Sequence, residues 1–189
     1  MAATMDRSFR AEWAAEALAA RPVILPRRHF VYPVEVEEVE RGALELLVRP
    51  AGGELFLATC ALGFASPAVP TGVWSCPDPA VVCAVAGGYA YMIDSRSPER
   101  WEQIGYRPVT EVRPIVEADL LVFASFHSIE AWSATGRLWQ TGRLSWEGVR
   151  LGEASATELR GWGWEMRTDT EVEFVVDLAT GKHTGGPRF

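Results

Sequence analysis

Carboxylates beside tryptophans in the last third of the chain come closest to a catalytic arrangement. Glu147 follows Trp146, Glu165 follows Trp164, and Asp177 lies on the next predicted strand. Glycosidases use two carboxyl groups about 5–10 Å apart as the acid and base, or acid and nucleophile, of the reaction. The sequence does not determine the separation of these side chains, and alternating strands also produce acidic faces with no catalytic purpose. A hydrolytic enzyme is therefore one hypothesis, and a solvated acidic surface is the other.

Tryptophan is the second notable residue type, with eight copies in 189 residues. Trp162 and Trp164 are two apart on a predicted strand, so both leave the same face with Arg160, while Gly161 and Gly163 leave the opposite face bare. Such a face suits the binding of a sugar or a flat ring. It equally suits a strip of core side chains that packs on a second layer. We favour the core interpretation because aromatic side chains are mostly buried. The candidate ligand-binding residues are Trp139, Trp146, Trp162, Trp164 and Arg160.

The sequence contains no motif for other common kinds of catalytic site. The three histidines are scattered at positions 29, 127 and 183, without the spacing of metal ligands. There is no GxSxG elbow and no glycine-rich loop before a helix. The three cysteines, at 60, 76 and 83, form no CxxC pair and read as buried free thiols, of which Cys76 looks the most exposed. We expect no metal and no cofactor, and we favour a protein that is not an enzyme over a hydrolytic enzyme.

Charge and hydropathy exclude two classes of partner. The formal net charge is -7, and affinity for nucleic acid rests largely on basic residues that neutralise phosphates. No stretch approaches the roughly 18 apolar residues of a membrane span, and the first 22 residues lack the basic and apolar regions of a secretory signal. The sequence predicts a cytoplasmic protein that binds neither nucleic acid nor membrane.

The elements that must position these residues are one helix followed by many strands. Apolar residues at steps of three and four predict a helix over about 6–20, which Pro22 ends. Short β-branched and aromatic runs fill about 23–186, with hairpins at 44–61 and 81–93 and an edge strand at 107–116. Four prolines predict a long surface loop at 64–80. Six further strands are expected at 120–126, 128–132, 137–140, 144–151, 157–164 and 171–178.

The last of these strands shows one-sided burial. Val172, Phe174 and Val176 fall on one face, and Glu171 and Glu173 on the other. We expect a mainly β protein of one domain, residues 1–189, in which an antiparallel meander forms a two-layer sandwich, a barrel-like sheet or a propeller-like sheet, with one N-terminal α-helix.

Two short segments carry a resemblance to known proteins. Ala131–Trp139 (AWSATGRLW) resembles the repeat of quinoprotein-type β-propellers, and Ala134-Thr135-Gly136-Arg137 recurs about 45 residues later as Ala179-Thr180-Gly181-Lys182. Two partial repeats cannot build the central quinone site of such a propeller, so the likeness implies only a propeller-like meander. Segments over about 40–186, among them Gly72–Pro77 and Leu144–Gly148, also resemble a small group of uncharacterised bacterial proteins, which implies no activity.

Three functional hypotheses follow from these observations. We favour a non-enzymatic binding or interaction module with a tryptophan-rich β surface, whose partner is a protein or a small molecule. The alternative is a carbohydrate-active or other hydrolytic enzyme that uses two of Glu147, Glu165 and Asp177. In the third, a homodimer pairs through an exposed edge strand.

Overall fold

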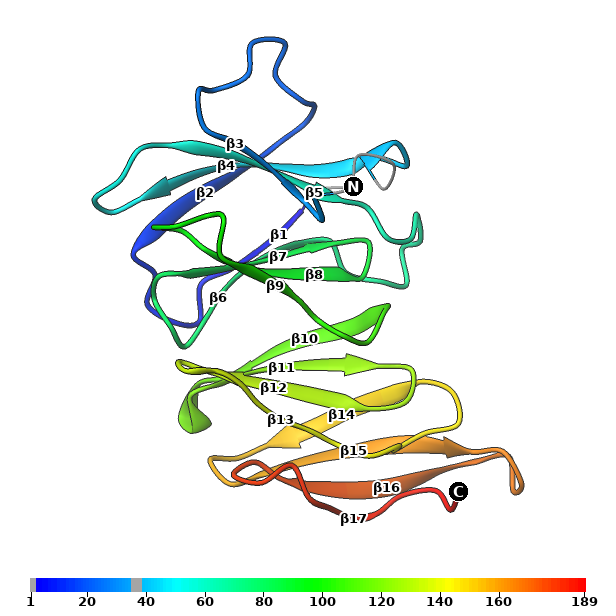
Figure 1. The fold of residues 1–189 in the computed structure, drawn as a ribbon. Helices are drawn as coiled ribbons and strands as arrows, with labels where there is room; N and C mark the ends of the chain where they lie inside the picture. The colour runs from blue at the N-terminus through cyan, green and yellow to red at the C-terminus, as the bar shows by residue number, and fades with distance from the viewer. Residues whose placement is uncertain (1–2, 35–38) are drawn as a thin grey trace. The chain divides into compact units, whose positions relative to one another are not determined.

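β-strands form the framework of the chain from end to end (Figure 1). The structure, a computed structural model, describes residues 3–34 and 39–189. Its contacts divide the chain into two units, Met1–Pro108 and Val109–Phe189, and each unit has its own pair of sheets. The predicted mainly β class is therefore confirmed. No helix in the described part of the chain is long and apolar enough to cross a bilayer.

Unit 1 contains a five-stranded sheet and a four-stranded sheet. The first has the order β1-β6-β7-β8-β9, with bounds Thr4–Asp6, Gly72–Ser75, Val81–Ala86, Tyr89–Asp94 and Trp101–Gln103. The second has the order β2-β4-β5-β3, with bounds Trp13–Leu18, Ala43–Pro50, Phe56–Ala61 and His29–Tyr32. β1 runs parallel to β6 and β3 parallel to β5, and the other pairs are antiparallel.

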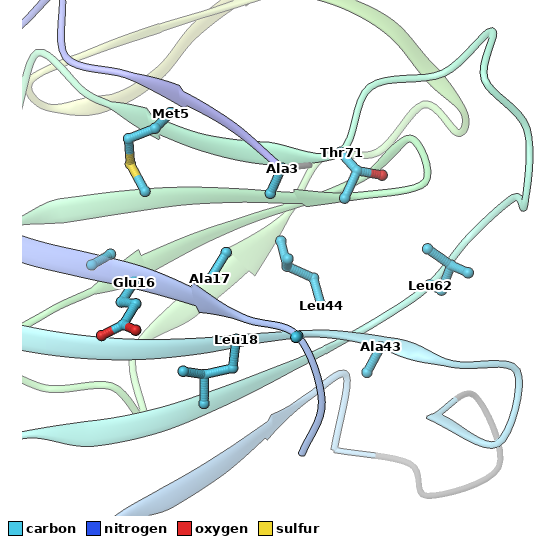
Figure 2. Close-up of a pocket in the computed structure, with 11 residues that line it drawn as sticks. Ala3, Met5, Glu16, Ala17, Leu18, Ala43, Leu44, Leu62 and Thr71 are labelled. Carbon is cyan, nitrogen blue, oxygen red and sulfur yellow. The ribbon is translucent and has the colours of Figure 1, made fainter. Parts of the chain in front are cut away.

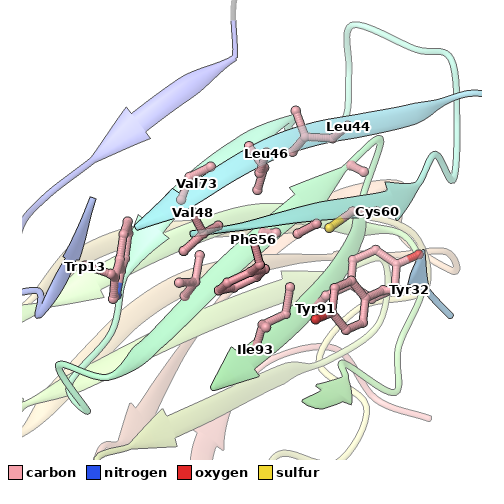
Figure 3. Close-up of a cluster of buried hydrophobic side chains, with 14 residues drawn as sticks. Trp13, Tyr32, Leu44, Leu46, Val48, Phe56, Cys60, Val73, Tyr91 and Ile93 are labelled. Carbon is pink, nitrogen blue, oxygen red and sulfur yellow. The ribbon is translucent and has the colours of Figure 1, made fainter. Parts of the chain in front are cut away.

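The core of unit 1 lies between facing sides of these two sheets (Figure 3). Alternate residues of β4 and β5, including Leu46 and Phe56, meet alternate residues of β7 and β8, including Val82 and Tyr91. All four of these side chains have 0% exposure. The buried Tyr32 ring adds a T-shaped contact to Trp101 at 5.4 Å, so aromatic packing closes one end of the core.

Unit 2 contains two four-stranded antiparallel meanders. The first is β10 (Val109–Ile115), β11 (Leu120–Ser125), β12 (Ile129–Ser133) and β13 (Gly136–Gln140), with the 3-10 helix η1 (Val116–Ala118) after β10. The second is β14 (Val149–Ala154), β15 (Glu158–Glu165), β16 (Thr170–Asp177) and β17 (His183–Gly185). Their common core includes Ile115, Val122, Ile129, Leu159 and Phe174. Five of the six predicted strands are confirmed as β11, β12, β13, β15 and β16. The strand predicted at 144–151 begins only at Val149, and the six strands are split between two sheets.

The predicted N-terminal helix is wrong. Residues 13–18 form β2, which pairs with β4 over six residues from Trp13↔Pro50 to Leu18↔Glu45. Trp13 is 5% exposed and its indole Nε1 donates to the carbonyl of Val81 at 2.9 Å. The helix propensity of alanine is a weak local preference, and a full antiparallel ladder with a buried tryptophan overrides it.

The predicted long loop at 64–80 is also partly wrong. Gly72–Ser75 form β6, which lies inside its sheet between β1 and β7, and all four residues are buried. The prolines of this segment, at 67, 70, 77 and 79, fall on either side of the strand, where no ladder donor is lost. Prolines at the ends of a segment therefore do not exclude a short central strand.

The predicted hairpins and turns are confirmed. β4 pairs with β5 and β7 with β8, and the Gly87-Gly88 turn has φ values of +56° and +77°, which glycine adopts at little cost. The expected edge strand is β10, at one end of its sheet. The segments Ala134–Arg137 and Ala179–Lys182 span the turns from the third to the fourth strand of the two meanders.

Candidate functional site: a groove between two open strand edges

A groove of about 700 Å³ lies in unit 1 between β1 and β2 (Figure 2). Ala3 and Met5 line one side, Ala15 and Ala17 of β2 line the other, and Leu44 of β4 also contributes. Known ligand pockets have volumes of about 300–1,000 Å³. The groove is thus large enough for several side chains of a ligand.

Both long sides of the groove are strand edges. β1 pairs with β6 and β2 pairs with β4, and among the described residues no strand pairs with the other edge of either. An open edge presents unpaired backbone N–H and C=O groups that another extended chain can pair with. The groove therefore offers hydrogen-bonding groups at its rim.

Most side chains that line the groove are small and apolar. Ala3, Ala15, Ala17 and Leu62 are partly exposed and pack against the unit 1 core, so the groove opens directly onto buried apolar surface. Among the described residues of the lining, Glu16 is the one with an ionisable side chain. Such a lining suits the binding of apolar side chains and offers no acid–base pair for a reaction.

The helix expected over residues 13–18 conceals this site in the sequence, because a groove at the edge of β2 requires these residues to form a strand. A signal was present: Trp13, Ala15 and Ala17 alternate with the exposed Ala14 and Glu16, which is the period of a strand. Over six residues rich in alanine, the helical and the alternating pattern compete, and only the pairing with β4 decides between them.

A buried polar cluster lies on the other face of the same sheet. Glu45 is 6% exposed, and Thr59 Oγ1 donates to its Oε2 at 2.5 Å. His29 Nε2 lies 2.9 Å from Thr59 Oγ1 and 3.2 Å from the guanidinium of Arg21. Burial, with the charge of Arg21, lowers the pKa of His29, against the smaller opposite effect of Glu45.

This cluster has the wrong order for nucleophilic catalysis. In a catalytic triad the imidazole stands between the acid and the hydroxyl, whereas here the Thr59 hydroxyl stands between Glu45 and His29. Arg21 Nε also lies 3.9 Å from Glu45 Oε1. The cluster therefore anchors the segment after β2 to the sheet.

The structure places Trp162 and Trp164 on the partly exposed face of β15, not in the core. The buried face carries Gly161 and Gly163 instead. A Cβ on Gly163 would lie 1.8 Å from the carbonyl oxygen of Leu144, and one on Gly161 would lie 2.4 Å from the ring of Phe174. Only glycine fits there, so the tryptophans must face outward.

Charged side chains share this outer face with the tryptophans. The guanidinium of Arg150 lies 4.1 Å from the centre of the Trp162 ring and also donates to both carboxylate oxygens of Glu171, at 3.1 and 2.6 Å. Arg160 pairs with Glu173 at 3.3 Å. Because Arg150 already covers one face of Trp162, an open stacking platform for a sugar is not formed at this residue.

The other two candidate tryptophans lie apart from this face. Trp139 is 8% exposed, belongs to the unit 2 core and donates from Nε1 to the carbonyl of Leu178 at 2.7 Å. Trp146 packs on Phe189 with ring centres 5.4 Å apart, and Arg143 lies 4.6 Å from its ring. The four tryptophans therefore do not form one binding surface.

Glu165 is held as an ionised, hydrogen-bonded carboxylate. Its Oε1 accepts from the backbone N–H of Arg167 at 3.1 Å and its Oε2 from that of Arg188 at 2.8 Å. These two bonds lower the pKa of Glu165. It lines a second groove, of about 510 Å³. An acid of lowered pKa is poorly suited to donate a proton at neutral pH.

Asp177 and Glu165 cannot act as a pair on one bond. Asp177 lies opposite Glu158 and Glu165 opposite Thr170, at the two ends of the β15–β16 ladder. Seven residue steps separate these ends, which is about 23 Å of strand. Asp177 Oδ1 accepts from the N–H and the hydroxyl of Thr180, and these bonds lower its pKa. Glu147 is an exposed residue of the segment before β14.

The thiols and the potential metal ligands offer no reactive centre in the part of the chain that the structure describes. Cys60, Cys76 and Cys83 are free and buried, and burial raises the pKa of each. Cys76 is 2% exposed and Cys60 and Cys83 are 0% exposed, so Cys76 is the most exposed of the three, as predicted, but it is buried like the others. Within the same residues, no group of three His, Cys, Asp or Glu side chains could hold a metal ion.

Comparison with known proteins adds little to this geometry. No family model and no curated protein matches the chain. A solved structure titled "Crystal structure of the eukaryotic initiation factor" is 12% identical over 75% of this chain, with a TM-score of 0.40. The chain spans 40% of that protein's length. A likeness this weak carries no argument about function.

In the described part of the chain, the protein is mainly β, with four sheets and with a groove in unit 1 bounded by two strand edges that have no partner strand.

Proposed function

We propose that this protein is a non-enzymatic binding module that takes up an extended, apolar segment of a polypeptide in the groove between β1 and β2. One observation carries the proposal: a groove of about 700 Å³ with an apolar lining lies between two strand edges that have no partner among the described residues. Small-molecule sites usually add convergent polar side chains, and Glu16 is the single ionisable one among the described residues here.

The expected mode of binding is the addition of a strand to the edge of β2. In this mode backbone hydrogen bonds supply affinity, and every second side chain enters a pocket. β2 has six residues, so it can pair with a segment about 20 Å long that directs about three side chains into the groove. Ala15 and Ala17 leave the space that those side chains need.

A hydrolytic enzyme remains the alternative prediction, but the geometry favours it less. Glu165 and Asp177 lie at opposite ends of one ladder and both have lowered pKa values. The enzyme hypothesis would therefore need Glu147 together with Glu165 or Asp177, and it predicts that Glu147→Gln abolishes hydrolysis of a glycoside panel.

The binding proposal is tested with a library of random peptides displayed on phage. We expect the wild-type protein to enrich peptides with apolar residues at every second position, and Ala17→Leu, which fills the groove, to lose them. Leu138→Ser, an exposed residue of unit 2, is the matched control and should retain them. Enrichment that is equal on wild type and Ala17→Leu, or absent on both, refutes the proposal.

A thiol probe then places the selected peptides on the structure. Because the three native cysteines are buried, a cysteine introduced by Ala17→Cys is the one that reacts in the folded protein. The selected peptide should slow its modification and should leave Ala14→Cys, on the exposed face of the same strand, unaffected. Equal rates with and without peptide at Ala17→Cys would exclude binding in the groove.

A further inference from the structure

The loop between β2 and β3 carries the most exposed apolar residues of the described chain. Pro22 and Pro26 enclose Val23, Ile24 and Leu25, whose exposures are 102%, 87% and 43%. Figure 1 shows this blue loop extending beyond the strands of its sheet. Adjacent apolar side chains with such exposure are unusual on a monomer and mark a surface that meets a partner.

The charge around these residues indicates an acidic partner. Arg21, Arg27 and Arg28 flank the apolar tip, and the sequence from 19 to 34 contains no acidic residue. The rest of the chain has ten more acidic than basic residues. An anionic lipid surface or a nucleic acid would attract the loop but repel the rest of the chain. A second copy of this chain offers the loop a groove whose described lining contains Glu16 and no basic side chain.

The loop and the groove also belong to one continuous region of the chain. Ala19 lines the groove, and Pro22 is only three residues further along the sequence. A two-fold dimer needs a self-complementary patch, in which a feature of each copy meets a different feature of the other. An apolar loop that starts at the rim of an apolar groove meets this requirement.

The two prolines restrict the backbone conformation of the loop before it binds. Each proline fixes its own φ and holds the preceding residue, Arg21 or Leu25, in an extended conformation. The loop therefore loses little conformational entropy when it is ordered in a binding site. Arg21 is further restrained at the base of the loop by His29 and Glu45.

We infer that two copies of this chain form a dimer by exchanging these loops, so that Ile24 of each copy enters the groove of the other. The inference rests on the proposed function, because it assigns the apolar segment that the groove takes up. It identifies the ligand as the segment Pro22–Pro26. It also explains the arginines that flank this segment as groups that interact with an acidic partner.

The test is sedimentation velocity of the full chain over a wide range of concentration. Wild type should shift from monomer to dimer, and Ile24→Ser in the loop and Ala17→Leu in the groove should each raise the dissociation constant at least about tenfold. Met5→Lys is a second groove variant on an exposed side chain, in case Ala17→Leu unfolds. Val116→Ser, which also removes an exposed apolar side chain, is the control and should dimerise as wild type does.

Mixing the variants distinguishes loop exchange from other dimers. Ile24→Ser keeps an intact groove and Ala17→Leu an intact loop, so an equal mixture regains one of the two contacts and should associate more than either variant alone. A wild type that stays monomeric, or a dimer that tolerates Ile24→Ser, overturns the inference. If phage-selected peptides still bind the groove in that case, the proposed function stands and only the identity of the ligand is wrong.

A membrane partner would be revealed by a separate measurement. Vesicles of phosphatidylcholine and phosphatidylglycerol are sedimented with the wild type and with Ile24→Ser. We expect no binding of either protein. Binding of the wild type that Ile24→Ser abolishes would overturn the dimer and assign the loop to a lipid surface.

Discussion

Replacing Gly163 by alanine tests why the tryptophans of β15 face outward. A Cβ at this position would lie 1.8 Å from the carbonyl oxygen of Leu144 and 3.1 Å from Cδ of Pro187. An ordinary contact needs at least 3.4 Å, so the two backbones must separate. Leu144 is 1% exposed and its N–H donates to the carbonyl of His127 at 2.6 Å. It cannot move without loss of packing or of this bond.

The expected cost of Gly163→Ala follows from these contacts. Overpacking in a core costs about 1–3 kcal/mol, and a lost backbone hydrogen bond costs about 0.5–1.5 kcal/mol more. The lower entropy of the unfolded alanine chain offsets about 0.4–1 kcal/mol. We therefore expect a loss of about 2 kcal/mol in the free energy of unfolding, which is about 4–8 °C in the melting temperature for a chain of this size.

The assay is urea and thermal unfolding followed by circular dichroism, with Gly52→Ala as the control. A Cβ on Gly52 would meet nothing within 4 Å, so this variant should lie within about 0.5 kcal/mol of wild type or be slightly more stable. If Gly163→Ala is as stable as Gly52→Ala, the close approach of β15 to Leu144 is wrong. The outward orientation of Trp162 and Trp164 would then lose its physical reason.

Three further outcomes test other parts of the structure. The thiols at 60, 76 and 83 should not react with a disulfide reagent in the folded protein, and all three should react in denaturant; a thiol that reacts as fast as free cysteine would contradict their burial. Because the folded pKa of His29 lies below 6.5, neutral His29 contributes stability that is complete above about pH 6.5 and is lost as the pH falls from there towards the lowered value. Unfolding of wild type and His29→Gln across this range should show that slope in wild type only, and an equal slope in both would exclude His29 as its source. Arg150→Ala uncovers the ring of Trp162, so acrylamide should quench the emission more strongly than in wild type, whereas Arg137→Ala, a change at an exposed residue of β13, should leave quenching unchanged.

Local pattern predicted much of the fold correctly. The hairpins at 44–61 and 81–93 depend on alternating runs around glycine turns, and both are properties of a few neighbouring residues. The one-sided burial of β16 is of the same kind: Phe174 and Val176 are buried, and Glu171 and Glu173 are exposed. Such patterns survive in the folded state because each strand needs one face towards the core.

The errors arose where distant segments compete with local preference. Residues 13–18 have the composition of a helix, but their ladder with β4, about 30 residues away, makes them a strand. The prolines around Gly72–Ser75 predict a loop, but pairing with β1 on one side and β7 on the other makes this segment a strand. In both cases the backbone hydrogen bonds formed with remote strands outweigh the preference of the isolated segment.

The candidate site shows the same division most clearly. From the sequence alone came the predicted strand at 157–164 with its period of two and the absence of a catalytic motif. Tertiary structure alone decided which face of β15 is buried, because the space above Gly161 and Gly163 is filled by Phe174 and by the Leu144 carbonyl. It also decided that β1 and β2 are edges with a groove between them. A sequence specifies the chemistry and period of each strand, but a groove exists only where remote strands stop pairing, and that depends on how the whole chain is packed.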